Sequence, residues 1–430
     1  MKKFKLNKIG RRFWRTICVL FTLLVIWNIY YISTFTRFRE SAPITTAISH
    51  PEYTYQIKEA TALLQDIGEQ KEFPSFSIAI GHQGKVVWSA AVGYQDIDAN
   101  IPATSKTQYR IGSTSKAVTT TGVARAVDNH KIQLNAIIGD TITNWTKKEW
   151  DFSMQQLLSH TAGMGNYKDF GYDAGKYTLC NCYEFKTASE GLTVFDQYDL
   201  IFEPGTSFAY STFDINLASV VLEQAVSTPF LEYMETQVFQ PLGMKYTYGD
   251  HDKPKTEHFA TFYNTEDGYY REYRSFEQVY DINLSYKWAG GGFISTPTDL
   301  VKMGNAYLTD DTFLSQETKR AFWTPMKLDN GEVNEQLYAL GWRSYLEHKN
   351  KNFLDGETPI WMVHHGGVSK GSQNFLLLFP NYDLVIDASI NTNVENFGTF
   401  SNEVYKIANA FLKTIEKEEI SLYQEIKEHM

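Results

Sequence analysis

An uncharged stretch near the N-terminus dominates the hydrophobic pattern of this chain. No charged side chain occurs from Thr16 to Thr36, and Cys18 to Ile32 is almost wholly apolar. A helix of this length, at about 1.5 Å per residue, matches the roughly 30 Å hydrocarbon core of a bilayer. Seven basic residues precede the run and two follow it, which predicts a cytoplasmic N-terminus. We expect a basic tail over residues 1–15, a transmembrane anchor over 16–36 and a polar tether over 37–51. A cleaved signal peptide is the alternative, but no A-x-A-like site follows the run.

Beyond the anchor, the apolar spacing changes from helical to alternating and back. It predicts a helix over 55–70, a hairpin over 76–91 and a mostly helical stretch over 117–238. Strand-like segments return before a closing helix over 402–412, and these are 340–346, 361–364, 375–379 and 384–389. This order predicts an α+β fold over residues 52–412, in which terminal helices flank an antiparallel sheet and an all-helical lobe is inserted. A charged helical tail is expected over 413–430, and the cleft between the lobes is the expected place for a site.

Composition and charge narrow the function classes. The chain has 430 residues, 43% of them hydrophobic, and a net charge of −10. Residues 1–40 carry nine Lys or Arg and one acid, so the remaining 390 residues carry about −18. A body this acidic, without a basic stripe, is not expected to bind nucleic acid. Cys180 and Cys182 are too close in sequence for an easy mutual disulfide. An intermolecular bond or a metal role is the alternative for this pair.

Ser113 and Lys116 stand three positions apart at the start of a helical stretch, 117–129. Because residues i and i+3 share a helix face, the hydroxyl and the amine can touch. A serine hydroxyl needs a base at neutral pH, and a lysine serves only where burial or neighbouring charge lowers its pKa. An isolated S-x-x-K is equally well an N-cap serine with a solvated lysine. The choice between the two interpretations therefore depends on the rest of the chain.

Four further segments, in this order, resemble the serine β-lactamase-related family of class C β-lactamases, DD-peptidases and related esterases, which also carries S-x-x-K. They are Tyr109–Gly112, Leu157–Gly163, Phe202–Thr212 and Trp361–Gly367. Tyr210-Ser211-Thr212 and the stretch 285–296 more narrowly resemble the mitochondrial serine β-lactamase-like proteins and their bacterial relatives. The resemblance covers roughly residues 52–412 and implies the β-lactamase/transpeptidase-like fold with serine hydrolase chemistry.

The resemblance implies a catalytic centre of Ser113, Lys116 and Tyr210. Tyr210 matches the tyrosine of the family's Y-x-N motif, whose phenol shares proton transfer with the lysine. Acyl transfer also needs two preorganised N–H donors for the oxyanion. The resemblance implies the backbone N–H groups of Ser113 and Gly367. Glycines at 366 and 367 would let a peptide-like substrate approach as an added strand.

The expected substrate-binding residues depart from the β-lactamase pattern. Thr212 stands where class C enzymes have the asparagine of Y-x-N, and its hydroxyl replaces only part of that amide. His364, His365 and Gly366 match K-T-G, so a permanent cation is missing. A β-lactam is therefore not expected to be the main acyl donor. A shared metal ion is not expected either, since successive strand side chains face opposite sides. His160 is expected to be structural.

The sequence thus predicts a membrane-anchored serine hydrolase that acts through an acyl-enzyme on peptide or peptidoglycan-like amide bonds. A carboxylesterase or β-lactamase of the same fold, or a catalytically quiet sensor or filament scaffold, are the alternatives. No metal and no organic cofactor are expected. The expected partners are a peptide or ester substrate and, through the N-terminal helix, a membrane. The oligomeric state stays open. The catalytic domain is expected outside the cytoplasm, in a periplasm, at a cell surface or, in a eukaryote, in an organelle's intermembrane space.

Overall fold

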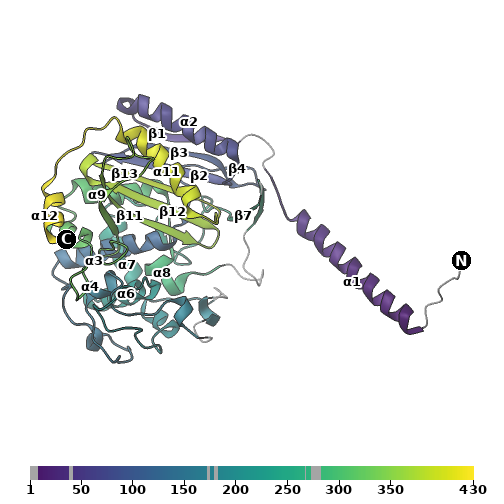
Figure 1. The fold of residues 1–430 in the computed structure, drawn as a ribbon, viewed down its shortest axis with the longest axis horizontal. Coiled ribbons are helices and arrows are strands. Elements are labelled where there is room, and N and C mark those ends of the chain that lie inside the picture. The colour runs from purple at the N-terminus through teal and green to yellow at the C-terminus, as the bar shows by residue number, and fades with distance from the viewer. Residues whose placement is uncertain (1–7, 38–41, 172–174, 179–182, 267, 273–281) are drawn as a thin grey trace.

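The computed structural model describes residues 8–37, 42–171, 175–178, 183–266, 268–272 and 282–430, and an antiparallel sheet organises its body (Figure 1). Seven strands lie in the order β1-β3-β2-β13-β12-β11-β10, and an eighth, β4, pairs with β3. Their bounds are β1 Ile44–Ser49, β2 Ser75–His82, β3 Lys85–Asp96, β4 Ile101–Pro102, β10 Arg343–His348, β11 Ile360–Ser369, β12 Ser372–Phe379 and β13 Leu384–Ile390. The expected hairpin is β2–β3, and Gly84 takes the left-handed conformation at its turn with φ of 73°.

Successive side chains of each strand point to opposite faces of the sheet, and apolar side chains pack against both faces. In β12, Leu376 and Leu378 join one apolar cluster with the helical lobe, whereas Leu377 joins the other. The second cluster lies under α2 (Thr54–Gln70) and α11 (Phe397–Leu412), the two helices expected to flank the sheet. The central strands therefore read as continuous hydrophobic runs.

The other face of the sheet carries the helical lobe, which lies below the strands in Figure 1. Its helices are α3 Ser115–Asp128, α4 Met154–Leu158, α6 Thr212–Val226, α7 Phe230–Met234, α8 Trp288–Gly291, α9 Pro297–Thr309 and α10 Gln316–Trp323. Short strands lie in and around this lobe. They are β5 Tyr109–Arg110, β6 Tyr248–Gly249, β7 Tyr263–Glu266, β8 Tyr269–Glu272 and β9 Phe293–Ser295.

The described chain between α3 and α6 is less helical than expected. After α4 the backbone takes left-handed conformations at His160, with φ of 61°, and at Gly163, with φ of 86°. A left-handed residue ends an α-helix, and only short helices occur among the described residues from there to α6. Cys180 and Cys182 lie outside the described residues.

The tether differs from expectation, and the helical tail docks onto the body. Residues 44–49 of the expected tether form β1, an edge strand that pairs with β3, and Thr45 Oγ1 donates to Ala103 O at 2.7 Å. The expected tail forms α12 (Ser421–His429), whose Leu422 and Ile426 are buried in the apolar cluster of the helical lobe. Apolar side chains dispersed among charges thus dock both segments onto the body.

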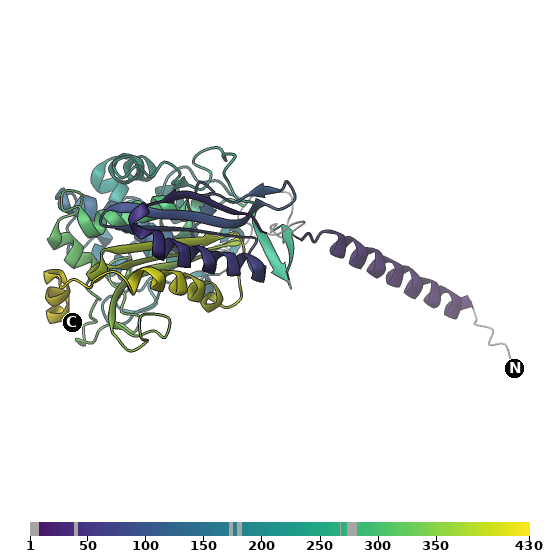
Figure 2. The ribbon, with the colours of Figure 1, turned by 90° about the horizontal axis from the view of Figure 1, so that it is seen from above.

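The N-terminal helix α1 (Lys8–Ser33) projects away from the body (Figure 2). Its part from Arg12 to Ser33, 22 residues long, is apolar enough to cross a membrane and is exposed along its length. This helix lies where the anchor is expected.

Candidate active site

Ser113 stands on a single turn of 3-10 helix, Gly112–Thr114, that leads from β5 into α3. The turn lies against β11, and Gly112 adopts φ of 53°. A Cβ at Gly112 would fall 2.6–2.7 Å from the backbone of Val368. Only glycine therefore allows strand and turn to meet this closely.

Lys116 is fully buried one helical turn below the serine. Its Nζ donates to Ser113 Oγ at 3.4 Å and to Gly290 O at 2.5 Å, and it lies 4.9 Å from the centroid of the Tyr210 ring. Burial, helped by the positive charge of Arg343, lowers the pKa of Lys116 to about 7. The amine can therefore be neutral near neutral pH, as a base must be.

Tyr210 stands just before α6, whose N-cap is Ser211. Burial raises the pKa of Tyr210 to about 12, against the opposing effects of a hydrogen bond with Ser113 and of Arg343. The phenol therefore holds its proton over the physiological range and can donate it. The structure brings Ser113, Lys116 and Tyr210 together, as expected for a catalytic centre.

A buried pair that the sequence did not reveal supports Tyr210 from behind. His160 Nδ1 lies 2.8 Å from Asp214 Oδ2, and both side chains have no exposed surface. The His160 ring lies 4.5 Å from the ring of Tyr210. Burial lowers the pKa of His160 and raises that of Asp214. His160 is thus packed in the interior, as expected for a structural residue, and it lies next to Tyr210.

The two histidines of β11 face opposite sides of the sheet. His365 Nδ1 donates to Gly366 O at 2.8 Å, and its Nε2 accepts from the Tyr338 hydroxyl at 3.0 Å. Its ring lies 6.3 Å from that of Tyr210. His364 instead contacts Tyr345, with 4.7 Å between ring centroids. Of the pair, only His365 approaches Tyr210.

The neighbouring glycines, Gly366 and Gly367, also lie on opposite faces of the strand. A Cβ at Gly366 would meet Phe397, which belongs to α11 behind the sheet. A Cβ at Gly367 would fall 1.9 Å from Ile111 O and 2.9 Å from Thr114, beside the serine turn. His364 and Gly366 therefore lie on the face away from the centre, in contrast to the substrate-binding role expected for them. The K-T-G match shifts by one position, so that His365 replaces the lysine.

Thr212, the other expected substrate-binding residue, is the first residue of α6 and is 7% exposed. The absent side chain of Gly290 makes room for it, since a Cβ there would lie 2.6 Å from Thr212 Cγ2. Because Gly290 O accepts from Lys116, Thr212 packs behind an atom that positions the lysine amine.

Arg343, at the start of β10, is a cationic neighbour that no motif indicated. It pairs with His364 across the strands, and its guanidinium lies 5.4 Å from the Tyr210 ring centroid and 5.2 Å from that of Tyr338. Its Nη2 donates to Gln336 Oε1 at 2.6 Å. Arg343 supplies positive charge near the place where β-lactamases carry the lysine of K-T-G.

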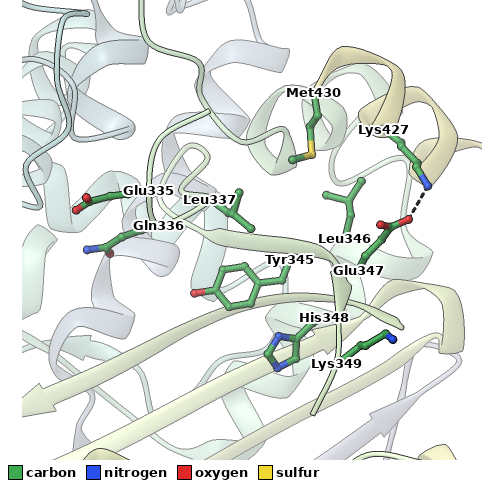
Figure 3. A pocket seen from close by; sticks show the side chains of 10 residues that line it. All are labelled: Glu335, Gln336, Leu337, Tyr345, Leu346, Glu347, His348, Lys349, Lys427 and Met430. Atoms are coloured by element: carbon green, nitrogen blue, oxygen red, sulfur yellow. Dashed lines mark hydrogen bonds and ion pairs between the residues drawn. The ribbon is translucent and has the colours of Figure 1, made fainter. Parts of the chain in front are cut away.

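A hollow of about 600 Å³ lies beside β10 (Figure 3). Its lining includes Gln336, Tyr345, His348 and Lys427, and Gln336 links it to Arg343. Figure 3 shows the Tyr345 side chain between those of Gln336 and Glu347. Charged, aromatic and amide groups therefore surround this space, and Gln336 is the lining residue that bonds Arg343. Within the described ranges, no group of three or more His, Cys, Asp or Glu side chains could hold a metal ion.

Gly367→Ala is expected to lower the free energy of unfolding by about 1–3 kcal/mol or more, because its methyl group would overlap Ile111 O. It would also displace the Ser113 turn. Gly291→Ala is the matched control, since a Cβ there meets only Lys287 side-chain atoms at 3.6–3.8 Å. Thermal and denaturant unfolding of the two variants would check this. Equal stabilities would contradict the close packing of turn and strand.

Comparison with known proteins agrees with this geometry. The sequence profile of the Beta-lactamase family matches residues 60–410. The mitochondrial serine beta-lactamase-like protein LACTB of Homo sapiens is 27% identical over 403 residues, covering 75% of this chain and 72% of that protein. Penicillin-binding protein 4* of Bacillus subtilis (strain 168) is 24% identical over 298 residues, covering 66% and 62%. The solved structure of EstCE1, a hydrolase with promiscuous acyltransferase activity, has a TM-score of 0.68 at 19% identity and covers 84% of this chain and 99% of that one.

Proposed function

Because this chain belongs to the Beta-lactamase family, whose members are serine acyl-transferring hydrolases, we propose that it is a membrane-anchored serine hydrolase acting on peptide-like amide bonds. One observation carries the proposal: a fully buried amine, Lys116 Nζ, lies 3.4 Å from Ser113 Oγ with its pKa lowered to about 7. A catalytically quiet scaffold has no need of a buried lysine kept ready to lose its proton. The apolar helix α1 supports the anchor.

In the proposed acylation, neutral Lys116 Nζ accepts the Ser113 hydroxyl proton while Oγ bonds to the substrate carbonyl carbon. The carbonyl electron pair moves to oxygen and gives a tetrahedral oxyanion. When that pair returns, the C–N bond breaks and the leaving nitrogen takes a proton from the Tyr210 phenol. The Lys116 ammonium returns a proton to Tyr210. A water molecule then attacks the ester carbonyl and gives a proton to the same pair of groups. When the bond from the carbonyl carbon to Ser113 Oγ breaks, Oγ takes that proton back and the acid is released.

We assign the oxyanion donors to the backbone N–H groups of Ser113 and Val368, in place of Gly367. Ser369 closes the two-residue turn between β11 and β12. The two residues that flank such a turn hydrogen-bond to each other. Along the two strands, hydrogen-bonded and non-hydrogen-bonded residue pairs then alternate. The N–H of Val368 therefore points away from β12. It faces the edge of β11 that β10 leaves uncovered, since the β10 pairing ends at His364.

The proposed substrate class rests on this uncovered edge of β11 and on the positive charge of Arg343. A strand edge that a further strand could extend favours an extended, peptide-like acyl donor over a compact ester. Arg343, whose guanidinium lies 5.4 Å from the Tyr210 ring centroid, would receive a carboxylate of the substrate. The expected ester substrate is the second candidate, because an ester passes through the same oxyanion.

Arg343→Gln is expected to raise KM for an amide substrate with a free carboxylate by about 10- to 100-fold, since a charge-assisted hydrogen bond would be lost. The same substrate with its carboxylate converted to a carboxamide is the control, and its KM should change little. Steady-state kinetics on both substrates would check this. Equal effects on the two would contradict carboxylate binding by Arg343.

Covalent labelling tests the proposed function directly. The full chain in detergent is treated with a fluorophosphonate and, separately, with a fluorescent penicillin, alongside Ser113→Ala. We expect rapid fluorophosphonate labelling of Ser113, weak penicillin labelling and turnover of peptide amides. Wild type that labels no better than Ser113→Ala would overturn the hydrolase in favour of the scaffold. Turnover of esters with no turnover of amides would replace the peptidase with a carboxylesterase, and fast turnover of penicillin would indicate a β-lactamase.

A further inference from the structure

The end of α1 is joined to the body by backbone pairing. Thr36 N donates to Tyr270 O at 2.7 Å, and Tyr270 N donates to Thr36 O at 2.8 Å. Thr36 follows Ser33, the last residue of the apolar span, by three positions, and Tyr270 belongs to β8 of the β7–β8 hairpin. The hairpin is therefore held at the level where α1 would leave a bilayer.

A hollow of about 570 Å³ lies between α1 and this hairpin. Its walls include Trp27, Tyr30 and Tyr31 of α1, Asp98 of the turn after β3 and Arg271 of β8. Trp27 is 64% exposed and Tyr30 54%. An α-helix of 22 residues is about 33 Å long, so these aromatic side chains in its last turns fall within the interfacial layer of a bilayer that α1 spans.

Arg271 is the cation of this hollow. Its guanidinium lies 4.7 Å from the Tyr31 ring centroid and 5.5 Å from that of Phe35. Among the described residues, no carboxylate lies within ion-pair distance of it. A guanidinium carries five N–H donors in a planar fork that matches two phosphate oxygens. Stacked on aromatic rings, it is fixed in orientation, and within the described part of the chain its side-chain donors bond no acceptor.

We propose that this hollow binds the headgroup of a phospholipid from the bilayer that holds α1. The inference rests on the proposed membrane anchoring. The phosphate accepts hydrogen bonds from Arg271, and the glycerol and upper acyl chains lie along Trp27 and Tyr30. The carboxylates of Asp98 and Glu272 in the same hollow favour a zwitterionic headgroup, whose amine they would approach. The bound lipid would join the anchor to the hairpin and restrain the tilt of the catalytic domain.

Photo-crosslinking of the full chain in phosphatidylethanolamine–phosphatidylcholine vesicles tests this. Tyr269, two positions before Arg271 on the same face of β8, is 48% exposed and is replaced by p-benzoylphenylalanine. Ile201, on the helical lobe and 49% exposed, is the matched control position. Mass spectrometry should find a phospholipid adduct at 269 about tenfold above that at 201. Adding Arg271→Ala should remove most of that excess, and Arg271→Lys, which lacks the fork, should leave part of it.

The outcomes separate this inference from the proposed function. Resistance to an alkaline carbonate wash measures insertion, and fluorophosphonate labelling of Ser113 measures folding and activity. Arg320→Ala, at a cation paired with Glu425 on another face, should not change the adduct. Inserted, active protein with equal adducts at 269 and 201, or an adduct unchanged by Arg271→Ala, would overturn the headgroup site alone. Active protein that is washed off the vesicles would overturn the anchor and the site together.

Discussion

Lys116→Met is expected to lower the rate of fluorophosphonate labelling by about 10⁴-fold, and Ser113→Ala to abolish it. Methionine keeps the length and apolar stem of the buried lysine but has no amine to accept the Ser113 proton. The base and the nucleophile act as one unit, so combining the two substitutions should cost nothing further. Labelling kinetics followed by gel fluorescence, with the adduct located by mass spectrometry, would check the rates.

Lys148→Met is the control for this experiment. Lys148 is also a buried lysine with a lowered pKa, but it belongs to the helical lobe and bonds Asp196. Its replacement should affect stability and leave the labelling rate within about threefold of wild type. If Lys116→Met labelled within tenfold of wild type while folded, another group would have to be the base.

Fold class and family could be predicted from the sequence, and both are confirmed. Segments with strong local periodicity, such as the helix over 55–70 and the hairpin over 76–91, appear as α2 and β2–β3. Local signals failed where docking onto the body decides the structure. The apolar residues of β1 are too few to outweigh their polar neighbours in a sequence pattern, but they pack onto a strand far away along the chain. The tail over 413–430, expected to be helical, contains α12, but its docking onto the helical lobe had no local signal.

The candidate site divides in the same way. Ser113 and Lys116 are adjacent on one turn, so their spacing predicted their contact. In contrast, His364-His365-Gly366-Gly367 fits the K-T-G motif in two registers, and only the pairing of β11 with β12 selects a face. A one-residue shift moves every side chain of a strand to its other side.

No sequence motif indicated Arg343 or the His160–Asp214 pair. Arg343 reaches Tyr210 because β10 pairs with the first half of β11, up to His364. This contact is set by tertiary structure. His160 and Asp214 stand 54 positions apart, and their contact depends on the left-handed turn after α4. Each is an ordinary residue in the sequence until the fold brings it to the site.

The acylation rate is expected to rise with pH and to reach half its maximum near pH 7, the pKa of Lys116. Below that pH the amine is protonated, and the rate should fall about tenfold per pH unit. Three nearby groups do not titrate there, because burial raises the pKa of Tyr210 to about 12 and lowers those of His160 and His365 well below 6.5. Burial also raises the pKa of Asp214, which interacts with Lys116. The profile of labelling rate between about pH 5 and 10 is therefore compared with that of Asp214→Asn, and a titration step that remains in this variant reports Lys116.

Two substitutions should move this midpoint in opposite directions. The positive charge of Arg343 lowers the pKa of Lys116, so Arg343→Gln should shift the midpoint upward and slow the reaction at pH 7. The negative charge of Asp214 raises the pKa of Lys116, so Asp214→Asn should shift the midpoint downward. Because asparagine keeps the shape of the carboxylate beside His160, a shift in midpoint would separate charge from packing. Shifts of the same sign in both variants would mean that the titrating group is not Lys116.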